Sequence, residues 1–322
     1  MRWRLRGSWC VIVNRGGFPT LRLGTRASKM ARIQALKVVQ ALERIGIAVS
    51  VVEVKTLGDR LAEVPIDQIE SPSPFCEDIE SLLRSGDIDL AVHSFKDLAV
   101  EPSDDLIVAA VLGRDDPREC LVSHSGSLQS LSTGAVIGTS SRRRTLQLLS
   151  IRPDLTTRPM RGAVDDRIQQ VQSGAFDGAV LAVAGIQRLA MMDSVAEVFP
   201  IETFMPSPAQ AVLAIQARAG DTDLAAAIAN VNHDNTRRCV EAETGLLRLM
   251  QQAPDDDGGR HLQEGEISAL ATTHGEAIEL RARWTSSQGT VTRDVLATGI
   301  DAAECTNSAW TELKQSAIGS SS

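Results

Sequence analysis

The sequence of 322 residues contains no tyrosine, and aromatic residues make up only 3% of it. A ligand site built from stacked aromatic rings is therefore disfavoured, which leaves charged side chains and backbone amides as the means of recognition. The sequence also has no run of about 18 apolar residues that could span a membrane. These absences favour an anionic ligand and disfavour a membrane partner.

Cysteine and basic residues are also scarce. Five cysteines without C-x-x-C spacing indicate neither a disulfide scaffold nor a zinc site, so no metal is predicted and a cytoplasmic location is expected. Lysine and arginine number 33 against 41 acidic residues, which gives a formal net charge of -8. Nucleic-acid-binding domains usually carry a basic excess, so nucleic acid is not an expected partner.

The order of the hydrophobic patterns predicts an α/β fold. Residues 21–25 alternate like a short strand, Ser28 is placed to cap a helix, and residues 47–54 are rich in β-branched side chains. This strand, helix and strand imply a parallel pair with a right-handed crossover. Residues 1–19 are interpreted as a loose N-terminal extension. The expected apolar positions of the helix are Ile33, Leu36, Val39 and Leu42.

Later patterns predict further domains. A connection near Asp115 leads into a second α/β unit, and residues 211–217 form a buried segment that leads back to the first domain. Two alternating runs around Gly275 predict a hairpin in an α+β C-terminal part. We therefore predict an extension at 1–19, a first α/β domain at 20–113 and 205–228, a second α/β domain at 114–204, and an α+β domain at 229–318.

Polar residues follow the buried strand predicted at residues 88–94, namely Ser94, Lys96 and Asp97. The carboxyl end of a parallel strand is where α/β proteins place ligands. A lone aspartate after a strand is most often a helix cap or a turn residue. Among cations, however, a single carboxylate can stabilise a developing positive charge or act as a general acid or base. Both interpretations of Asp97 stay open here.

Three hydroxyl residues at positions 139–141 precede three arginines at positions 142–144. Cations in the first turn of a helix oppose the helix dipole by about 0.3–1 kcal/mol each, so the pattern favours a bound anion that compensates them. The alternative is a solvated basic face. Several cations fall at predicted junctions between strands and helices, which favours a ligand with several carboxylates or phosphates. These cations are Arg26, Lys96, Arg143, Arg144, Arg161 and Arg167.

Other residues with reactive side chains are assigned to the core. His93 lies inside a predicted strand, and Cys76 and Cys120 are expected to be small buried residues. The sequence contains no P-loop, no G-x-G-x-x-G and no G-x-S-x-G, so neither a nucleotide-dependent nor an esterase-like function is indicated.

Seven segments carry a resemblance to a known family. They are LRLGTRAS (21–28), DIDLAVHSFKDL (87–98), RDDPRE (114–119), GTSSRRR (138–144), RPDL (152–155), RG (161–162) with Arg167, and LAVAGIQRL (181–189). LAIQAR (213–218) and NHDNTRRCVEAE (232–243) match more loosely. Over residues 21–250 the sequence thus resembles the porphobilinogen deaminase family, also called hydroxymethylbilane synthases. The resemblance implies two α/β domains like those of periplasmic binding proteins, plus a small α+β domain.

The resemblance also implies a reaction and a site. Members of the family are transferases of porphyrin and heme biosynthesis that join four porphobilinogen units, with loss of ammonia, into the linear tetrapyrrole hydroxymethylbilane. Asp97 would be the catalytic carboxylate that stabilises positive charge on the pyrrole nitrogens. A dipyrromethane cofactor and a monomeric state are likewise implied. The residues that would hold the acetate and propionate side chains of the substrate are Arg26, Ser28, Ser94, Lys96, Thr139, Ser141, Arg143, Arg144, Arg161 and Arg167.

The sequence departs from the family pattern in the cofactor loop. The family carries dipyrromethane on a cysteine of the third domain, but the segment from Gln251 to Ser268, which is predicted to hold this loop, contains no cysteine. Counting along the chain places Pro254 or Gln263 at the anchor, and neither can form a thioether. Covalent attachment is therefore not supported, and no residue is identifiable as the attachment site.

Smaller departures occur elsewhere in the family pattern. They are SPSPF (71–75) for Gly-Lys-Gly-Leu-Phe, AQA (209–211) for Gly-Gln-Gly, and Ala163 and Asp166 beside the second arginine pair. The last of these changes places an acid beside Arg167.

Three hypotheses follow from these observations. The chain is a divergent porphobilinogen deaminase that holds its primer noncovalently, a related enzyme that condenses another pyrrole or stops short, or a noncatalytic binder of a carboxylated ligand. Asp97 and the complete set of arginines favour a catalytic role, because a binder has no need of that acid. The missing cysteine argues against full chain elongation. We place the first hypothesis ahead.

Overall fold

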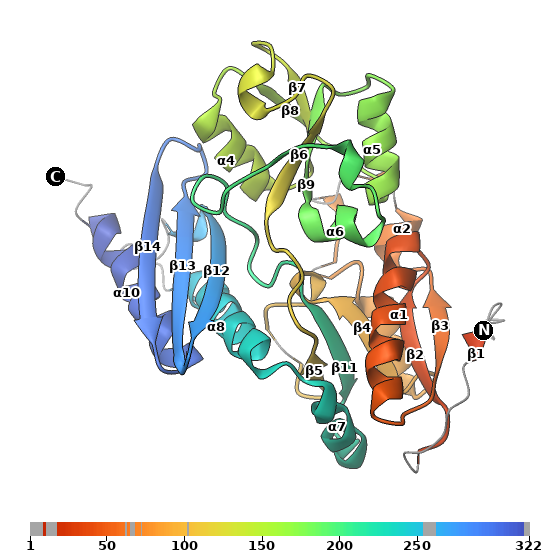
Figure 1. The fold of residues 1–322 in the computed structure, drawn as a ribbon. Helices are drawn as coiled ribbons and strands as arrows, with labels where there is room; N and C mark the ends of the chain where they lie inside the picture. Colours follow the sequence, from red (N-terminus) through yellow and green to blue (C-terminus); the bar gives the residue numbers. More distant parts are fainter. Residues whose placement is uncertain are drawn as a thin grey trace. The chain divides into compact units, whose positions relative to one another are not determined.

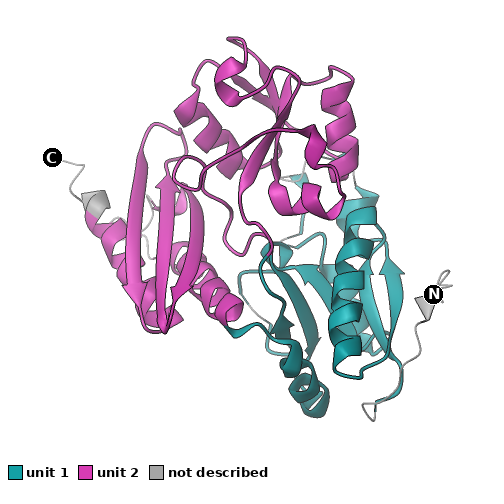
Figure 2. Cartoon of the chain, in the orientation of Figure 1, with its two compact units in different colours: residues 1–114, 212–234 teal, residues 115–211, 235–322 magenta. Residues whose placement is uncertain are grey.

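The computed structural model describes residues 9–10 and 18–318, except 62, 65–67, 72, 102 and 254–261. The chain divides into two compact units, which Figure 2 shows in different colours. The first contains residues 1–114 and 212–234, and the second contains residues 115–211 and 235–322. In the described part, no helix is both long enough and apolar enough to cross a membrane.

The first unit is built on a six-stranded sheet with the strand order β1-β3-β2-β4-β11-β5 (Figure 1). β2 pairs in parallel with β3 and β4, which confirms the predicted β-α-β start. β11 runs antiparallel between β4 and β5, so the chain does return to the first sheet. The strands are β1 (Trp9–Cys10), β2 (Leu21–Arg26), β3 (Val49–Val54), β4 (Leu90–Ser94), β5 (Leu106–Val111) and β11 (Leu213–Arg218).

Residues 1–19 were expected to form a loose extension, but β1 pairs antiparallel with β3. The other elements of the first unit are the helices α1 (Lys29–Arg44), α2 (Leu57–Arg60), α3 (Glu77–Ser85) and α7 (Thr222–Ile228), with 3-10 turns at Phe95–Asp97 and Ala229–Val231. Gly86 ends α3 in the left-handed conformation, with φ of 77°, which glycine adopts without steric cost.

Helix α1 begins where the sequence predicts, but its buried face differs from the expected one. The Ser28 hydroxyl caps the helix by accepting a hydrogen bond from the Ala31 amide at 3.2 Å. Leu36 is 55% exposed, so its assignment to the core is wrong. Val39 and Leu42 are buried as predicted, but the rest of the buried stripe differs from the expected one. This stripe contains Ala31, Ala35, Val38 and Leu42.

The second unit contains a five-stranded sheet with the order β10-β6-β9-β7-β8. β7 pairs in parallel with β8 and β9, and β6 pairs antiparallel with β9 and β10. The strands are β6 (Glu119–Ser123), β7 (Val136–Gly138), β8 (Thr156–Arg158), β9 (Gly178–Ala182) and β10 (Val195–Val198). The helices of this part are α4 (Arg142–Ile151), α5 (Val164–Gln172) and α6 (Val183–Arg188), with 3-10 turns at Leu128–Ser130 and Met192–Ser194.

A three-stranded antiparallel sheet, β12-β13-β14, completes the second unit. The predicted hairpin is confirmed, with Gly275 at φ of 64° between β12 and β13. The buried Trp284 donates its indole N–H to the Leu262 carbonyl at 2.9 Å. These elements are β12 (Glu266–His274), β13 (Ala277–Thr285) and β14 (Thr292–Gly299), with the helices α8 (Asp234–Gln251) and α10 (Ala302–Ile318) packed on the same core.

Two mixed α/β sheets and a small α+β part confirm the predicted fold class. The α+β part has its own sheet and its own hydrophobic core, as a separate domain would. It nevertheless belongs to the same compact unit as residues 115–211, and the chain returns to the first unit at residue 212. The predicted domain boundaries stay a prediction.

Candidate active site

In the first unit, one edge of the parallel strands brings three of the predicted residues together. β2 ends at Arg26, its neighbour β4 ends at Ser94, and the turn after β4 ends at Asp97. Because β2 and β4 are parallel, their carboxyl ends lie at the same edge of the sheet. The three side chains line one pocket there, together with Ala31, Gln34, Phe75, Cys76, Val92 and His93.

The pocket is small, with a cavity volume of about 20 Å³, which is room for about one water molecule. The Ser94 hydroxyl accepts a hydrogen bond from the Gln34 side-chain amide at 2.9 Å. The Cys76 thiol donates to the backbone carbonyl of Asp97 at 3.0 Å. These contacts fix the Ser94 hydroxyl and the backbone of Asp97 in the lining of the pocket.

The Arg26 guanidinium already has two partners inside the unit. It forms an ion pair with Asp59 at 2.5 Å, and it lies over the Phe75 ring, 4.1 Å from the ring centroid. Burial raises the pKa of Asp59, but the hydrogen bond and the charge of Arg26 outweigh it, and the pKa is lowered overall. A ligand carboxylate that binds Arg26 must therefore compete with an ionised aspartate.

Two further predicted residues belong to this unit. Ser28 uses its hydroxyl to cap α1, and Lys96 occupies the middle of the turn Phe95–Asp97. Neither lines the pocket that contains Asp97. Their assignment to substrate binding stays a prediction.

His93 is a buried core residue, as the sequence analysis expected. Its Nε2 lies 3.1 Å from the Gln216 side-chain oxygen, and the Gln216 amide donates to Glu80 at 3.0 Å. Burial lowers the pKa of His93 to about 4, against a smaller opposing effect of the Gln216 hydrogen bond. The imidazole is therefore neutral near pH 7, and it supplies no cation to the pocket.

In the second unit, hydroxyl groups surround the start of α4. The Thr139 hydroxyl accepts a hydrogen bond from the Ser141 amide at 3.2 Å, and the Ser141 hydroxyl caps the helix by accepting one from the Arg144 amide at 3.4 Å. The Ser140 hydroxyl donates to the Met160 carbonyl at 2.8 Å. The predicted sequence of strand, hydroxyl cap and helix is confirmed.

Arg143 and Arg144 are buried around a carboxylate of the chain itself. Arg143 pairs with Glu119 and also donates to the Met205 carbonyl, while Arg144 holds both Glu119 oxygens, at 3.0 and 2.7 Å. Glu119 is fully buried. Burial lowers the pKa of the Arg143 guanidinium, and the charge of Glu119 opposes that effect.

This cluster changes the interpretation of the three successive arginines. Glu119 supplies one negative charge against the two guanidinium groups of Arg143 and Arg144, so part of the compensation that the sequence analysis assigned to a bound anion comes from the chain itself, and a solvated basic face does not describe these buried residues. Arg142 lies 3.8 Å from Glu266 and donates to the Glu264 carbonyl at 3.1 Å. Sequence reasoning missed Glu119, because the separation of 24 residues from Arg143 gives no local signal.

The last two predicted cations belong to the segment around α5. Arg167 donates to the Gly162 carbonyl at 2.9 Å, and the Arg161 carbonyl accepts from Gln170 at 3.0 Å. The Asp166 carboxylate accepts a hydrogen bond from the Ala163 amide at 3.1 Å, which closes the start of the helix. The acid beside Arg167 thus has a structural role as a helix cap.

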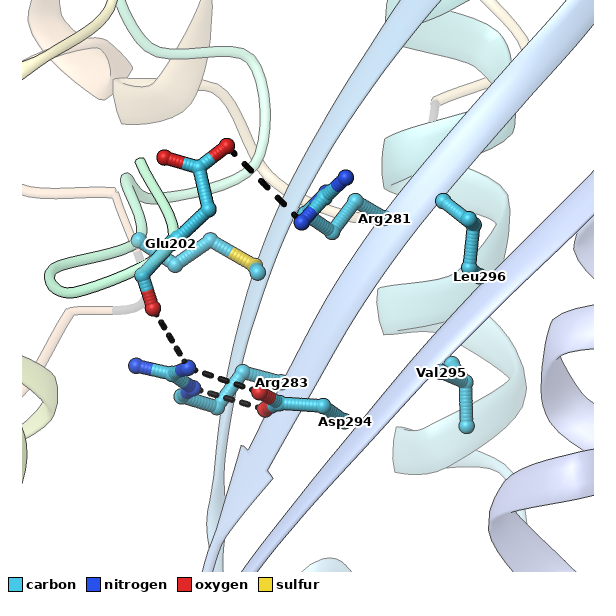
Figure 3. A pocket seen from close by; sticks show the side chains of 7 residues that line it. Glu202, Arg281, Arg283, Asp294, Val295 and Leu296 are labelled. Atoms are coloured by element: carbon cyan, nitrogen blue, oxygen red, sulfur yellow. Dashed lines mark hydrogen bonds and ion pairs between the residues drawn. The ribbon is translucent and has the colours of Figure 1, made fainter. Parts of the chain in front are cut away.

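A larger pocket in the second unit contains none of the predicted residues (Figure 3). Its two arginines are matched by acids: Arg283 holds Asp294 through two hydrogen bonds of 2.7 Å, and Arg281 lies 3.8 Å from Glu202. Arg283 also donates to the backbone carbonyls of residues 202 and 203. With its charges balanced in this way, the pocket lacks the cationic excess that a polycarboxylate requires.

The segment predicted to hold the cofactor loop is shorter in the structure than the sequence analysis expected. Gln251 is the last residue of α8, and Ser268 is the third residue of β12, paired with Arg283 of β13. The segment from Gln251 to Ser268 therefore contains the start of β12 as well as the loop. Sequence polarity missed the start of β12, because backbone pairing with β13 extends the strand through polar positions.

Ser268 is also unavailable as a site for the cofactor. Its side chain is 1% exposed, and its hydroxyl accepts a hydrogen bond from the Gln147 side-chain amide at 3.0 Å. The same amide donates to the Met205 carbonyl at 2.9 Å. The Ser268 hydroxyl thus has a structural role, since it helps to join α4 to the three-stranded sheet.

The fold and the site define an α/β protein that places one carboxylate and several arginines at the carboxyl ends of parallel strands. Comparison with known proteins identifies the family. Residues 21–226 match the family described as "Porphobilinogen deaminase, dipyromethane cofactor binding domain". The chain belongs to the porphobilinogen deaminase family.

Curated relatives match most of the chain. Porphobilinogen deaminase of Alkaliphilus metalliredigens is 33% identical over 84% of this chain and 84% of its own length. That of Syntrophomonas wolfei is 36% identical over 84% and 86%, and that of Geotalea uraniireducens is 40% identical over 71% and 72%. The similarity therefore extends over more than two thirds of each protein.

Solved structures are much less similar. An ancestral arginine-binding protein is 16% identical, with a TM-score of 0.37 over 67% of this chain and 91% of that chain. A periplasmic sulfonate-binding protein, SsuA of Methylobacillus flagellatus, is 17% identical, with a TM-score of 0.38 over 76% and 72%. The fold class rests on the sheets described above.

The residues of the cofactor loop do not fit a sulfur-linked group. Pro254, one of the two anchor positions obtained by counting along the chain, lies outside the described residues. Gln263, the other position, is exposed and donates its side-chain amide to the Gln251 and Ala253 carbonyls. An amide cannot form the thioether that the resemblance implies.

Proposed function

We propose that this chain condenses porphobilinogen, with loss of ammonia, into the linear tetrapyrrole hydroxymethylbilane. The observation that carries the proposal is the pocket at the ends of β2 and β4, where Asp97, Arg26 and Ser94 meet in a chain of this family. The relatives that share most of the sequence are named for the same activity.

The proposed chemistry needs one carboxylate close to the reacting pyrrole. The bond between the aminomethyl carbon and nitrogen of one porphobilinogen breaks, and ammonia leaves. The exocyclic carbon then forms a bond with the free α-carbon of another pyrrole, which loses its α-proton. Positive charge develops on the ring nitrogens during both steps, and the Asp97 carboxylate would stabilise it.

The acetate and propionate groups of the substrate would be held by the cations and hydroxyls at the strand ends. Arginine suits this role because its guanidinium binds a carboxylate through two parallel hydrogen bonds. For Arg143 and Arg144, Glu119 would fix the guanidinium orientation. The proposed binding residues are Arg26, Ser28, Ser94, Lys96, Thr139, Ser141, Arg143, Arg144, Arg161 and Arg167.

We also propose that the chain acts as a monomer in the cytoplasm, with a small-molecule substrate and without nucleic acid, membrane or metal. Support for a reducing compartment comes from the four cysteines whose side chains the structure describes, since none of these four forms a disulfide.

The experiment that tests the proposed function is incubation of the purified chain with porphobilinogen. Substrate consumption and ammonium release are followed, and the acid-oxidised product is identified by absorbance and mass. We expect ammonium release with uroporphyrin as the oxidised product. Binding of porphobilinogen without ammonium release would contradict the proposal and would favour the noncatalytic binder.

A further inference from the structure

Three of the five cysteines lie in hydrophobic cores. Cys120 belongs to the core of the five-stranded sheet, and Cys239 and Cys305 belong to the core of the three-stranded sheet. Cys76 lies at the N-cap position of α3. None of these four side chains is more than 6% exposed. Cys10 is the fifth cysteine, and its side chain lies outside the described residues.

Burial also makes these thiols poor nucleophiles. The reactive form of cysteine is the thiolate, and burial raises the pKa of Cys120 to about 12. Burial likewise raises the pKa of Cys76 and of Cys305. At neutral pH, all three are protonated. A bond between one of these sulfurs and an electrophilic pyrrole would need both a proton loss and a local opening of the core.

Cys76 is the thiol that comes nearest to a functional position, because it lines the pocket of Asp97. Its hydrogen is donated to the Asp97 carbonyl at 3.0 Å, so the sulfur is held against the backbone and is 1% exposed. The negative charge of Asp97 adds to burial in raising its pKa. The contact that holds the catalytic turn in place thus also disfavours a bond between this sulfur and a pyrrole.

The cofactor loop supplies no replacement for sulfur at its described anchor position. The Gln263 amide joins the two flanks of the loop by donating to the Ala253 carbonyl at 2.5 Å and to the Gln251 carbonyl at 3.2 Å. This side chain is neutral, has no nucleophilic atom and is engaged in the backbone of the loop. The loop has a structural link where the family pattern has a covalent anchor.

The following inference rests on the proposed function. We infer that this chain starts each product without a sulfur-linked primer, and that a reversibly bound second porphobilinogen is the first acceptor. One porphobilinogen loses ammonia as its C–N bond breaks. Its exocyclic carbon bonds to the free α-carbon of the second molecule, whose α-proton leaves. Two porphobilinogens thus give one dipyrrole and one ammonia, and the dipyrrole retains a free α-carbon for further additions and the aminomethyl group of the acceptor. After two more additions, the C–N bond of this last aminomethyl group breaks, a fourth ammonia leaves, and water adds at the same carbon to give hydroxymethylbilane.

Noncovalent binding has a consequence for the product. Each growing chain is held only by ion pairs and hydrogen bonds of its carboxylates, so short oligopyrroles can dissociate before four rings are joined. A mixture of dipyrroles, tripyrroles and tetrapyrroles is expected, and the share of tetrapyrrole rises as more carboxylates add contacts.

Intact-protein mass spectrometry tests this inference directly. The chain is purified from cells that make porphobilinogen, denatured in acid and weighed before and after incubation with porphobilinogen. We expect the mass of the unmodified sequence in both samples, and pyrrole that reacts with an aldehyde reagent should elute with the small molecules on a desalting column. A mass increase by one or more pyrrole units, mapped by peptide analysis to any cysteine, Cys10 included, would overturn the inference.

Two substitutions at one exposed position supply matched variants. Gln263→Cys places an accessible thiol in the loop, and Gln263→Ser makes a similar small side chain without sulfur. A gain of pyrrole mass by Gln263→Cys alone supports the inference, because it shows that the loop can carry a pyrrole only when sulfur is provided. A gain by Gln263→Ser or by the unchanged chain would contradict it.

The dependence of rate on substrate gives a second readout. If both pyrroles bind reversibly, the initial rate of ammonium release should rise with the square of porphobilinogen concentration when that concentration is low. A linear dependence would show that an acceptor was already in place. Failure to consume porphobilinogen would contradict the proposed function, whereas the intact mass decides the present inference by itself.

Discussion

Among single residues, Asp97 has the most specific predicted role. We expect Asp97→Asn to abolish ammonium release while it leaves porphobilinogen binding largely intact, because asparagine keeps the shape but cannot stabilise a positive charge on the pyrrole nitrogens. Calorimetry measures the binding, and ammonium release measures the reaction. The exposed Asp104→Asn is the control and should keep the full rate. A normal rate in Asp97→Asn would remove the catalytic assignment.

Removal of the negative charge of Asp59 is predicted to strengthen substrate binding, because Asp59 is paired with Arg26. Asp59→Asn keeps a hydrogen-bond acceptor for Thr56 but removes the charge that competes with a substrate carboxylate. A partly exposed pair contributes up to about 1 kcal/mol, so we expect KM to fall by up to about fivefold with little change in kcat. An increased KM would show instead that Asp59 positions Arg26 for the substrate.

At the scale of elements, Glu119 joins β6 to the first turn of α4. Glu119→Gln removes the charge that compensates two buried guanidinium groups, and we expect a loss of about 3–5 kcal/mol in the free energy of unfolding. The pair of Asp116 and Arg118, which is more exposed than Glu119 and its partners, supplies the matched control, since Asp116→Asn should cost about 1 kcal/mol or less. Denaturant titration measures both. Equal losses would show that Glu119 is no more important than a surface acid.

Backbone strain near α6 gives a further prediction for an element. Ala190 is exposed and has a φ of 55°, a conformation that costs a residue with a Cβ roughly 1–2 kcal/mol. We expect Ala190→Gly to raise the free energy of unfolding by about 0.5–1 kcal/mol. The same substitution at the exposed Ala226 inside α7 should lower it by about 1 kcal/mol. Thermal unfolding of both variants checks the opposite signs.

Elements with local signals were predictable from the sequence, and contacts between distant residues were not. The Ser28 cap and the turn at Gly275 depend on neighbours in the chain, and both are confirmed. The buried face of α1 was wrong at Leu36, because packing against the sheet selects among several apolar stripes. The partner of Arg143 was missed for a related reason, since Glu119 lies 24 residues away in another element of the unit.

For the whole molecule, the sequence predicted the α/β class and the return of the chain to the first sheet, because these follow from the order of strands. The candidate site residues divide between the two units, with Asp97 in the first and Arg143 in the second. The Ala209 and Ala211 backbones keep positive φ values of 57° and 67°, although the sequence replaces the glycines of the family pattern there. A backbone conformation of this kind is imposed by the surrounding fold and cannot be read from alanine.

The stability of the chain should depend on pH through His93. Burial lowers the pKa of this imidazole from 6.5 to about 4, so below pH 6.5 the unfolded state binds a proton that the folded state does not. Stability is therefore complete above about pH 6.5 and falls by roughly 3 kcal/mol as the pH decreases to about 4. Burial also raises the pKa values of Asp59 and Asp89, but hydrogen bonds from Arg26 and Arg22 lower these pKa values overall. The two carboxylates therefore change the stability only at pH values below the range in which His93 does.

A pair of histidine variants isolates this effect. Because His93→Gln removes the buried titrating group and keeps a polar side chain opposite Gln216, we expect a flatter dependence of the unfolding midpoint on pH between about 4.5 and 6.5. His124→Gln changes an exposed histidine and should reproduce the slope of the unchanged chain. Thermal unfolding at half-unit pH steps gives the slopes. Parallel curves for all three proteins would mean that His93 takes up its proton equally well in the folded and unfolded states.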